Sequence, residues 1–177
     1  MDATSARPRP LRTAGLLQLY TPSDKEIVMT RVFDAPRRLV FEAFTKPELL
    51  GKWLLGPPGW TMPVCELDLR VGGAYRFLWR GPDGTHMGAS GVHREVVVPE
   101  RLVSTERFDE PWYPGEAIVT NELVEHQGKT TLTITILYES REARDIALKS
   151  GMDGGLAASY DRLAEVLPSI DPSEVHS

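Results

Sequence analysis

A long series of alternating segments, followed by one amphipathic helix, most constrains what this chain can fold into. Between residues 64 and 140, stretches such as VCELDLRV, AYRFLWR and KTTLTITILYES place large apolar residues at every second position. Such alternation is typical of strands with one buried face. Short turns that contain glycine or proline separate the stretches. Consecutive strands with tight turns predict an antiparallel meander.

The C-terminal segment MDGGLAASYDRLAEVLPS is the element that can cover the apolar face of this sheet. Its apolar residues recur at helical spacing. Gly154 and Gly155 each cost the helix about 1 kcal/mol relative to alanine, so we expect a packing reason for the pair. REARDIALKS is predicted to form a shorter helix that Gly151 interrupts.

The N-terminal part of the sequence is predicted to form two strands and two short helices. GLLQLY and KEIVMTRVF are strand-like, PRRLVFEAFT is helical, and a second helix runs from Pro47 to about Leu54. The whole order predicts an α+β fold. In it, a curved antiparallel sheet of about six or seven strands wraps around the long C-terminal helix, and the two short helices follow the first long strand.

Composition favours one globular domain and excludes several function classes. The chain has 177 residues, of which 41% are hydrophobic and 25% charged. We expect a domain over residues 15–168, with flexible tails at residues 1–14 and 169–177. The net charge of −5 and the absence of a Lys/Arg cluster argue against nucleic acid. No apolar run is long enough to span a membrane.

Cysteine and histidine patterns predict neither a disulfide nor a metal or cofactor site. Cys65 is the single cysteine, which fits a cytoplasmic location, and its alternation with leucines predicts a core position. His86 and His93 are seven residues apart in one predicted strand, so they face opposite sides unless a glycine bulge intervenes. We expect both to be surface or edge histidines.

The sequence resembles the START-like SRPBCC superfamily, in the branch named for activators of the heat-shock-chaperone ATPase. The resemblance covers roughly residues 25–168 and is carried by RVFDAPRRLVFEAFTKPELLGKWLLGPPG, DLRVGGAYRF, the PERLV turn and GMDGGLAASYDRLAEVL. It implies the helix-grip fold of START and Bet v-like proteins, with a deep cavity between sheet and helix. Members bind lipids, hormones or polyketides, and some cyclise polyketides or activate a chaperone. None of the shared motifs is catalytic.

Candidate cavity residues lie on the predicted inner faces of the strands and of the last helix. Glu106 follows Leu102 and Ser104 in one alternating pattern, and its carboxylate inside a core would need a hydrogen bond or a proton. If His93 also faced inward, the two could form an acid/base pair or orient a ligand; a different register would leave both in solvent. The predicted cavity set is Trp53, Trp60, Tyr75, Phe77, Trp79, His93, Glu106, Asn121, Ile134, Ile136, Met152, Leu156, Ser159 and Tyr160.

Two aromatic loops are candidates for the cavity entrance. In KWLLGPPGW, Trp53 is expected to pack inward, while residues 56–60 form a gate-like rim. The alternative is that both tryptophans complete the core. DEPWYPGE is the second loop, and it either shapes the same entrance, presents a contact patch or packs on its own aromatic residues.

We expect a non-enzymatic protein that binds a small apolar or amphipathic molecule, without a cofactor. One alternative is a co-chaperone or stress-response protein that contacts a heat-shock chaperone. The other is a polyketide cyclase or hydrolase that uses Glu106 with a partner within hydrogen-bond reach. Composition leaves a monomer or a homodimer open.

Overall fold

A nine-stranded antiparallel sheet forms most of the computed structural model, which describes residues 8–170. Its strand order is β1-β2-β3-β9-β8-β7-β6-β5-β4. The strands are β1 (Arg12–Ala14), β2 (Leu17–Tyr20), β3 (Glu26–Phe33), β4 (Thr61–Leu67), β5 (Ala74–Arg80), β6 (His86–Val97), β7 (Arg101–Phe108), β8 (Ala117–His126) and β9 (Lys129–Leu137).

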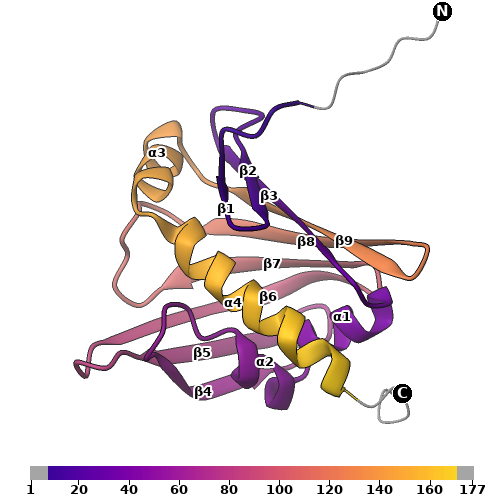
Figure 1. The fold of residues 1–177 in the computed structure, drawn as a ribbon. Helices are drawn as coiled ribbons and strands as arrows, with labels where there is room; N and C mark the ends of the chain where they lie inside the picture. The colour runs from indigo at the N-terminus through magenta and orange to yellow at the C-terminus, as the bar shows by residue number, and fades with distance from the viewer. Residues whose placement is uncertain (1–7, 171–177) are drawn as a thin grey trace, which may run out of the picture.

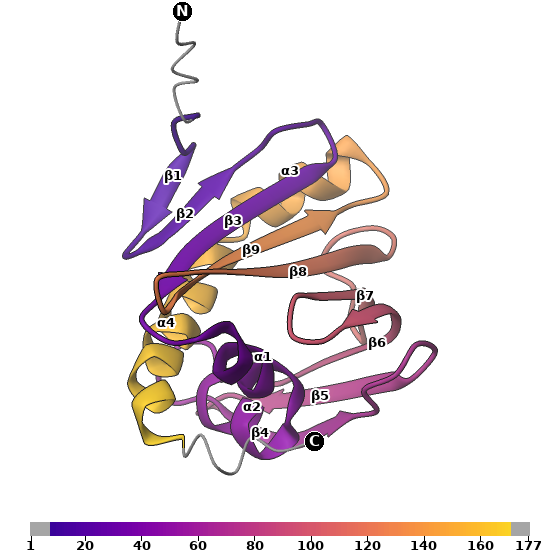
Figure 2. The same ribbon diagram turned by 90° about the vertical axis from the view of Figure 1, so that its right-hand side faces the viewer.

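The helices lie on the concave side of this sheet. They are α1 (Arg37–Thr45), α2 (Pro47–Trp53), α3 (Arg141–Lys149) and α4 (Met152–Val166), and a 3-10 turn (Leu167–Ser169) follows α4. In Figure 1, α4 crosses the sheet diagonally, and its backbone runs close to α2, β1 and β2. Figure 2 shows the sheet curving from β1 to β4 around the helices. This arrangement is the predicted curved sheet around a C-terminal helix and fits the helix-grip fold.

The prediction of six or seven strands was wrong, because the sheet has nine. The six strands after the helices agree with the sequence pattern. The difference lies before β3, where Arg12–Ala14 pairs with β2 although these residues were expected to belong to the N-terminal tail. At the other end, Ser169 closes the 3-10 turn. The remaining predicted tail residues 1–7 and 171–177 lie outside the described residues.

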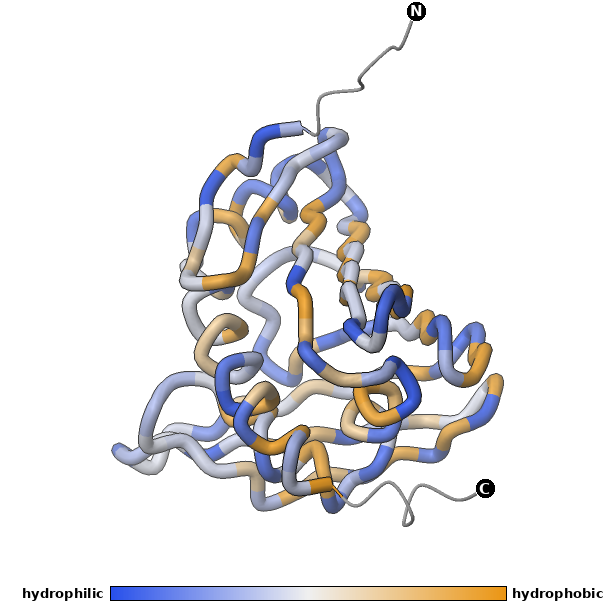
Figure 3. Tube along the Cα trace, turned by 45° about the vertical axis from the view of Figure 1, so that its right-hand side comes forward, coloured by the Kyte–Doolittle hydropathy of each residue, from blue (hydrophilic) through white to orange (hydrophobic). Residues whose placement is uncertain are grey.

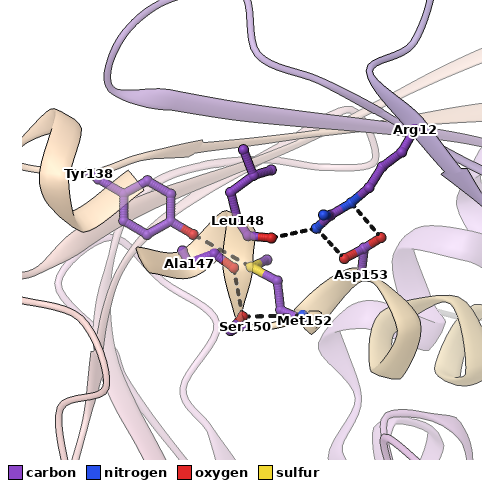
Figure 4. A network of polar contacts seen from close by, with 7 residues as sticks. All are labelled: Arg12, Tyr138, Ala147, Leu148, Ser150, Met152 and Asp153. Atoms are coloured by element: carbon purple, nitrogen blue, oxygen red, sulfur yellow. Dashed lines mark hydrogen bonds and ion pairs between the residues drawn. The ribbon is translucent and has the colours of Figure 1, made fainter. Parts of the chain in front are cut away.

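Arg12 ties the first strand to the junction of α3 and α4 (Figure 4). Its Nε donates to Oδ2 of Asp153 at 3.0 Å, and its Nη2 donates to Oδ1 at 2.6 Å. The same Nη2 donates to the carbonyl oxygen of Leu148 at 2.6 Å. Asp153 is buried in the first turn of α4. These long-range polar contacts, which no local periodicity indicates, hold β1 against the start of α4.

Backbone and side chains approach closely where β6 pairs with β7. A Cβ atom at Gly91 would lie 1.8 Å from the carbonyl oxygen of Thr105. The hydroxyl of Tyr75 donates to this same oxygen at 2.7 Å. A register shift follows between His93 and Glu95, which marks a β-bulge. The close approach at Gly91 therefore rests on a position where only glycine fits.

The filled part of the core lies beneath β2, β3 and β9. Figure 3 shows hydrophobic and hydrophilic residues alternating along the chain, as half-buried strands require. The fully buried residues of this part come from the strands, from α1 and α2 and from the second half of α4; they include Leu17, Leu19, Ile27, Met29, Phe33, Val40, Trp53, Leu132, Tyr160 and Leu163. Beneath β5 to β8, several inward-facing side chains are only partly buried.

Gly91→Ala is expected to lower the free energy of unfolding by about 2–3 kcal/mol, because the added methyl group collides with backbone. The measurement is urea unfolding monitored by fluorescence. The matched control is Gly154→Ala, on the exposed side of α4 with open space around it. The control should be neutral or stabilising by up to ~1 kcal/mol. Equal effects of the two changes would contradict the proposed steric cause.

Candidate functional site

Some inward-facing residues of β5 to β8 retain accessible surface, although others on this face, such as Trp79, His93 and Leu123, are buried. Phe77, Phe108 and Val119 are only partly buried and pack against the edge of the core. Asn121 is half-buried as well. From the opposite side, Met152 and Leu156 of α4 are also partly buried. This half of the interior is therefore less completely filled than the half beneath β3 and β9.

Glu106 lies in the middle of this region, in a row of residues that crosses the sheet. Tyr75 pairs with Gly91, and Glu106 pairs with Ala117. The register of β6 with β7 places Gly91 beside Glu106, and that of β8 with β9 places Ala117 beside Tyr138. The carboxylate thus has two small residues as its direct neighbours and a tyrosine beyond each of them.

Desolvation dominates the electrostatics of Glu106. It raises the pKa of the carboxyl from 4.5 to about 7, and a hydrogen bond from Tyr113 opposes the rise. The Tyr113 hydroxyl donates to Oε1 at 3.2 Å. Burial, followed by the charge of Glu106, raises the phenol pKa values of four tyrosines: Tyr75, Tyr113, Tyr138 and Tyr160. The carboxylate is therefore deep in the protein, near phenol groups from several elements.

The DEPWYPGE loop contributes an aromatic wall next to Glu106. Tyr113 is buried, and its ring meets those of Trp112, Phe108 and Tyr138 edge-on, at centroid distances of 4.7, 6.0 and 5.1 Å. The loop was one of two predicted entrance loops, but Tyr113 itself was not in the predicted cavity set. No local pattern indicates it, because a loop residue carries no alternation.

The prediction that His93 is a surface or edge residue was wrong. Its side chain is 2% exposed, and its ring stacks on Tyr75 with centroids 5.7 Å apart. Nδ1 forms a hydrogen bond of 2.8 Å with Oγ of Ser104, while the buried Nε2 has no partner. Burial lowers the pKa of His93. The expected opposite orientation of His86 is confirmed, since His86 is exposed.

Glu106 and His93 share the inner face but do not form the acid/base pair that was considered. His93 pairs with Ser104 in the row next to that of Glu106. The hydrogen bond recorded for Glu106 comes from Tyr113. A phenol with a raised pKa keeps its proton at neutral pH, so it cannot act as a general base there. Among the described contacts, Glu106 is thus paired with a hydrogen-bond donor and not with a base.

The segment KWLLGPPGW divides into a core tryptophan and a bridging loop. Trp53 is 0% exposed, packs against Phe44 and Tyr160, and donates from Nε1 to the carbonyl oxygen of Ala43 at 3.0 Å. Both Trp53 and Tyr160 were predicted to line the cavity, but they lie in the filled half of the core. Trp60 is half-buried beside Gly81, at the turn between β5 and β6.

Residues 54–60 bridge α4 and β5. The Gly56 amide donates to Oγ of Ser159 at 2.8 Å, and Trp79 donates from Nε1 to the carbonyl oxygen of Leu54 at 2.7 Å. A Cβ atom at Gly155 would lie 3.6 Å from Pro57, an ordinary van der Waals distance, so this position does not require glycine and the predicted packing reason is not found there. Gly154 has no such contact. The loop therefore covers one edge of the region between α4 and β5.

The other predicted cavity residues lie on the inner face with different degrees of burial. Tyr75 and Trp79 are buried on β5, and Ile134 and Ile136 are buried on β9. Cys65, expected in the core, is half-buried on β4, and burial raises the pKa of its thiol to about 11.

Outside the interior, a surface hollow of about 330 Å³ lies where α1 meets the ends of β7 and β8. Its charged groups are already paired: Arg37 with Glu100 at 3.3 Å, and Arg101 with Glu122. Within residues 8–170 there is no group of three or more His, Cys, Asp or Glu side chains that could hold a metal ion. None of the helices in this range is long and apolar enough to cross a membrane.

Comparison with known proteins identifies one family. Residues 34–168 match the sequence model of the family described as "Activator of Hsp90 ATPase homolog 1-like protein". This confirms the branch of the superfamily that the sequence resembles. No curated protein matches the chain.

Solved structures from several bacteria share the fold. A crystal structure of a protein from Rhodobacter sphaeroides is 32% identical with a TM-score of 0.82, covering 87% of this chain and 99% of that one. One from Chromobacterium violaceum is 30% identical with a TM-score of 0.68, covering 82% and 98%. One from Nitrosomonas europaea is 27% identical with a TM-score of 0.72, covering 84% and 99%.

Glu106 is expected to make stability fall as pH rises. Its folded pKa of about 7 lies above the ordinary 4.5, so the folded state binds the proton more tightly. This contribution is fully present below pH 4.5 and is lost as pH rises through 7. Between pH 5 and 8, the free energy of unfolding of the wild type should therefore fall by about 1–3 kcal/mol relative to that of Glu106→Gln. Urea unfolding at several pH values measures this, and a difference that does not change with pH would contradict the desolvated carboxyl.

Proposed function

The chain belongs to the family of activator of Hsp90 ATPase homolog 1-like proteins, and on this basis we propose that it binds a small apolar or amphipathic molecule between α4 and the strands β5 to β8. The wall of the proposed site consists of aromatic and aliphatic side chains with one central carboxylate. Ligand sites in proteins commonly have this composition, in which a few polar groups orient the ligand among apolar ones.

The observation that carries the proposal is that Glu106 is desolvated and yet keeps accessible surface. Desolvation raises its pKa, so the carboxyl lies deep in the protein. The side chain nevertheless keeps accessible surface, as do Phe77, Phe108 and Val119 around it. A deep side chain that keeps accessible surface faces a hollow, because close packing would remove that surface. We infer that this hollow is the ligand cavity.

The hydrogen bonds around Glu106 favour binding over catalysis. Proton transfer would need a base or acid of matched pKa within reach. Tyr113 donates to Glu106, and burial raises the pKa of its phenol. His93 is hydrogen-bonded to Ser104. This arrangement supports a role for Glu106 in orienting a polar group of the ligand.

The loop of residues 54–60 is the proposed entrance. It bridges α4 and β5 through the bonds of Gly56 to Ser159 and of Trp79 to Leu54. The glycines at positions 56 and 59 have positive φ angles of 72° and 90°, and two prolines lie between them. A stiff Pro-Pro segment between two glycine turns can move as a unit. Opening of this loop would expose the space between α4 and β5 to solvent.

Filling the hollow is expected to abolish binding. Val119→Trp adds a large side chain on the inward face of β8, so retention of a small molecule should fall at least tenfold. Native mass spectrometry of freshly purified protein, compared with a denatured sample, measures retention. The control is Val124→Trp on the same strand, at a position that is 62% exposed. Thermal unfolding of both variants checks that the fold is retained.

Two outcomes of this experiment would contradict the proposal. One is equal retention by wild type and folded Val119→Trp protein, since the ligand would then lie elsewhere. The other is a wild-type protein that retains no small molecule and binds none when supplied with a neutral apolar dye. That second outcome would favour contact with a heat-shock chaperone.

A further inference from the structure

We propose that the ligand carries a protonated amine, and that the amine forms an ion pair with Glu106 inside a partly aromatic cage. This inference rests on the proposed binding function and names the chemical class that the site selects. It is carried by the incomplete hydrogen bonding of the carboxylate, by the lack of a neutralising cation beside it, and by the aromatic rings around it.

The carboxylate of Glu106 has unused capacity to accept hydrogen bonds. Its recorded partner is the Tyr113 hydroxyl, at the rather long distance of 3.2 Å from Oε1. A carboxylate can accept about four hydrogen bonds. Oε2 has no recorded partner and is not among the fully enclosed polar atoms of residues 8–170. This oxygen therefore keeps accessible surface and is available to a donor group.

No cation of the described residues neutralises this carboxylate. Desolvation and the Tyr113 hydrogen bond account for its shifted pKa, without a contribution from a basic group. The buried Arg31 on β3 donates to Asp161 of α4 at 2.6 Å. Burial lowers the pKa of His93, which favours its neutral form. A buried carboxylate without a counter-ion is costly, so a bound cation would relieve this cost.

Aromatic rings surround the place where the cation would lie. Tyr75 and Tyr138 lie at the two ends of the row that contains Glu106, and Tyr113 donates to the carboxylate itself. Phe77 and Phe108 both pair with Ala89 in the neighbouring row. An ammonium group is attracted to the faces of such rings, most strongly where water is excluded.

Other ligand classes fit this environment less well. An anionic head group would be repelled by Glu106, whose charge already raises the phenol pKa values nearby. A neutral hydroxyl could donate to Oε2 but would leave the charge uncompensated. A protonated amine donates a hydrogen bond to the carboxylate and also compensates its negative charge. The apolar body of the ligand would lie against Val119, Met152 and Leu156.

Three probes of matched size test this inference on the full chain at pH 8. They are 1-naphthylmethylamine, 1-naphthalenemethanol and 1-naphthoic acid, which present a cation, a neutral donor and an anion on the same ring system. Isothermal titration calorimetry measures binding to wild type, to Glu106→Gln and to Glu66→Gln. Glu66 is an exposed carboxylate on β4, so its variant controls for the loss of one negative charge.

The amine is expected to bind at least tenfold more tightly than the alcohol, and the acid most weakly. Glu106→Gln should reduce amine affinity at least tenfold and leave alcohol affinity within about twofold, whereas Glu66→Gln should change neither. Equal binding of amine and alcohol, or amine binding that survives Glu106→Gln, would overturn the amine inference and leave the proposed binding function standing. Failure of all three probes to bind would overturn both.

Discussion

The close contact between β6 and β7 at Gly91 is the constraint on which the curved sheet depends. It brings Gly91 against the Thr105 carbonyl, where no side chain fits, and Tyr75 secures the contact through its hydroxyl. Together with the β-bulge between His93 and Glu95, this contact curves the sheet around α4. The inward side chains of β3 and β9 are buried, whereas Phe77, Phe108 and Val119 keep accessible surface. The partly accessible inner face around Glu106 follows from this geometry.

Much of the fold could be predicted from local patterns. The alternation of apolar and polar residues in β4 to β9 predicts the strands and their inner faces. The positions of proline and glycine predict where α1 and α2 begin and end. Tyr75, Ile134 and Ile136 face inward as predicted, because a period of two residues fixes the face of each side chain. Alternation in β7 permitted an inward Glu106, but a register that left it in solvent stayed open. Periodic signals are reliable where each strand is regular.

The rest depends on contacts between distant parts of the chain. β1 pairs with β2 and is tied to α4 by the contact of Arg12 with Asp153, which no local pattern indicates. Alternation placed His93 and His86 on opposite faces but could not say which one was inside. Tyr113 lies in a loop without periodicity. Trp53 was assigned to the cavity, but its packing against Phe44 and Tyr160 places it in the filled core. Burial in such cases is decided by tertiary packing.

The central claim is that Glu106 is a desolvated carboxyl that faces a hollow in the interior. Its charge adds to the effect of burial in raising the phenol pKa values around it, and its accessible surface supports ligand binding. The most direct test is an NMR titration of the Glu106 side-chain carboxyl carbon in the ligand-free protein, assigned by comparison with Glu106→Gln. The account predicts a titration midpoint near 7. A midpoint near the ordinary 4.5 would show a solvated carboxylate and would contradict the account.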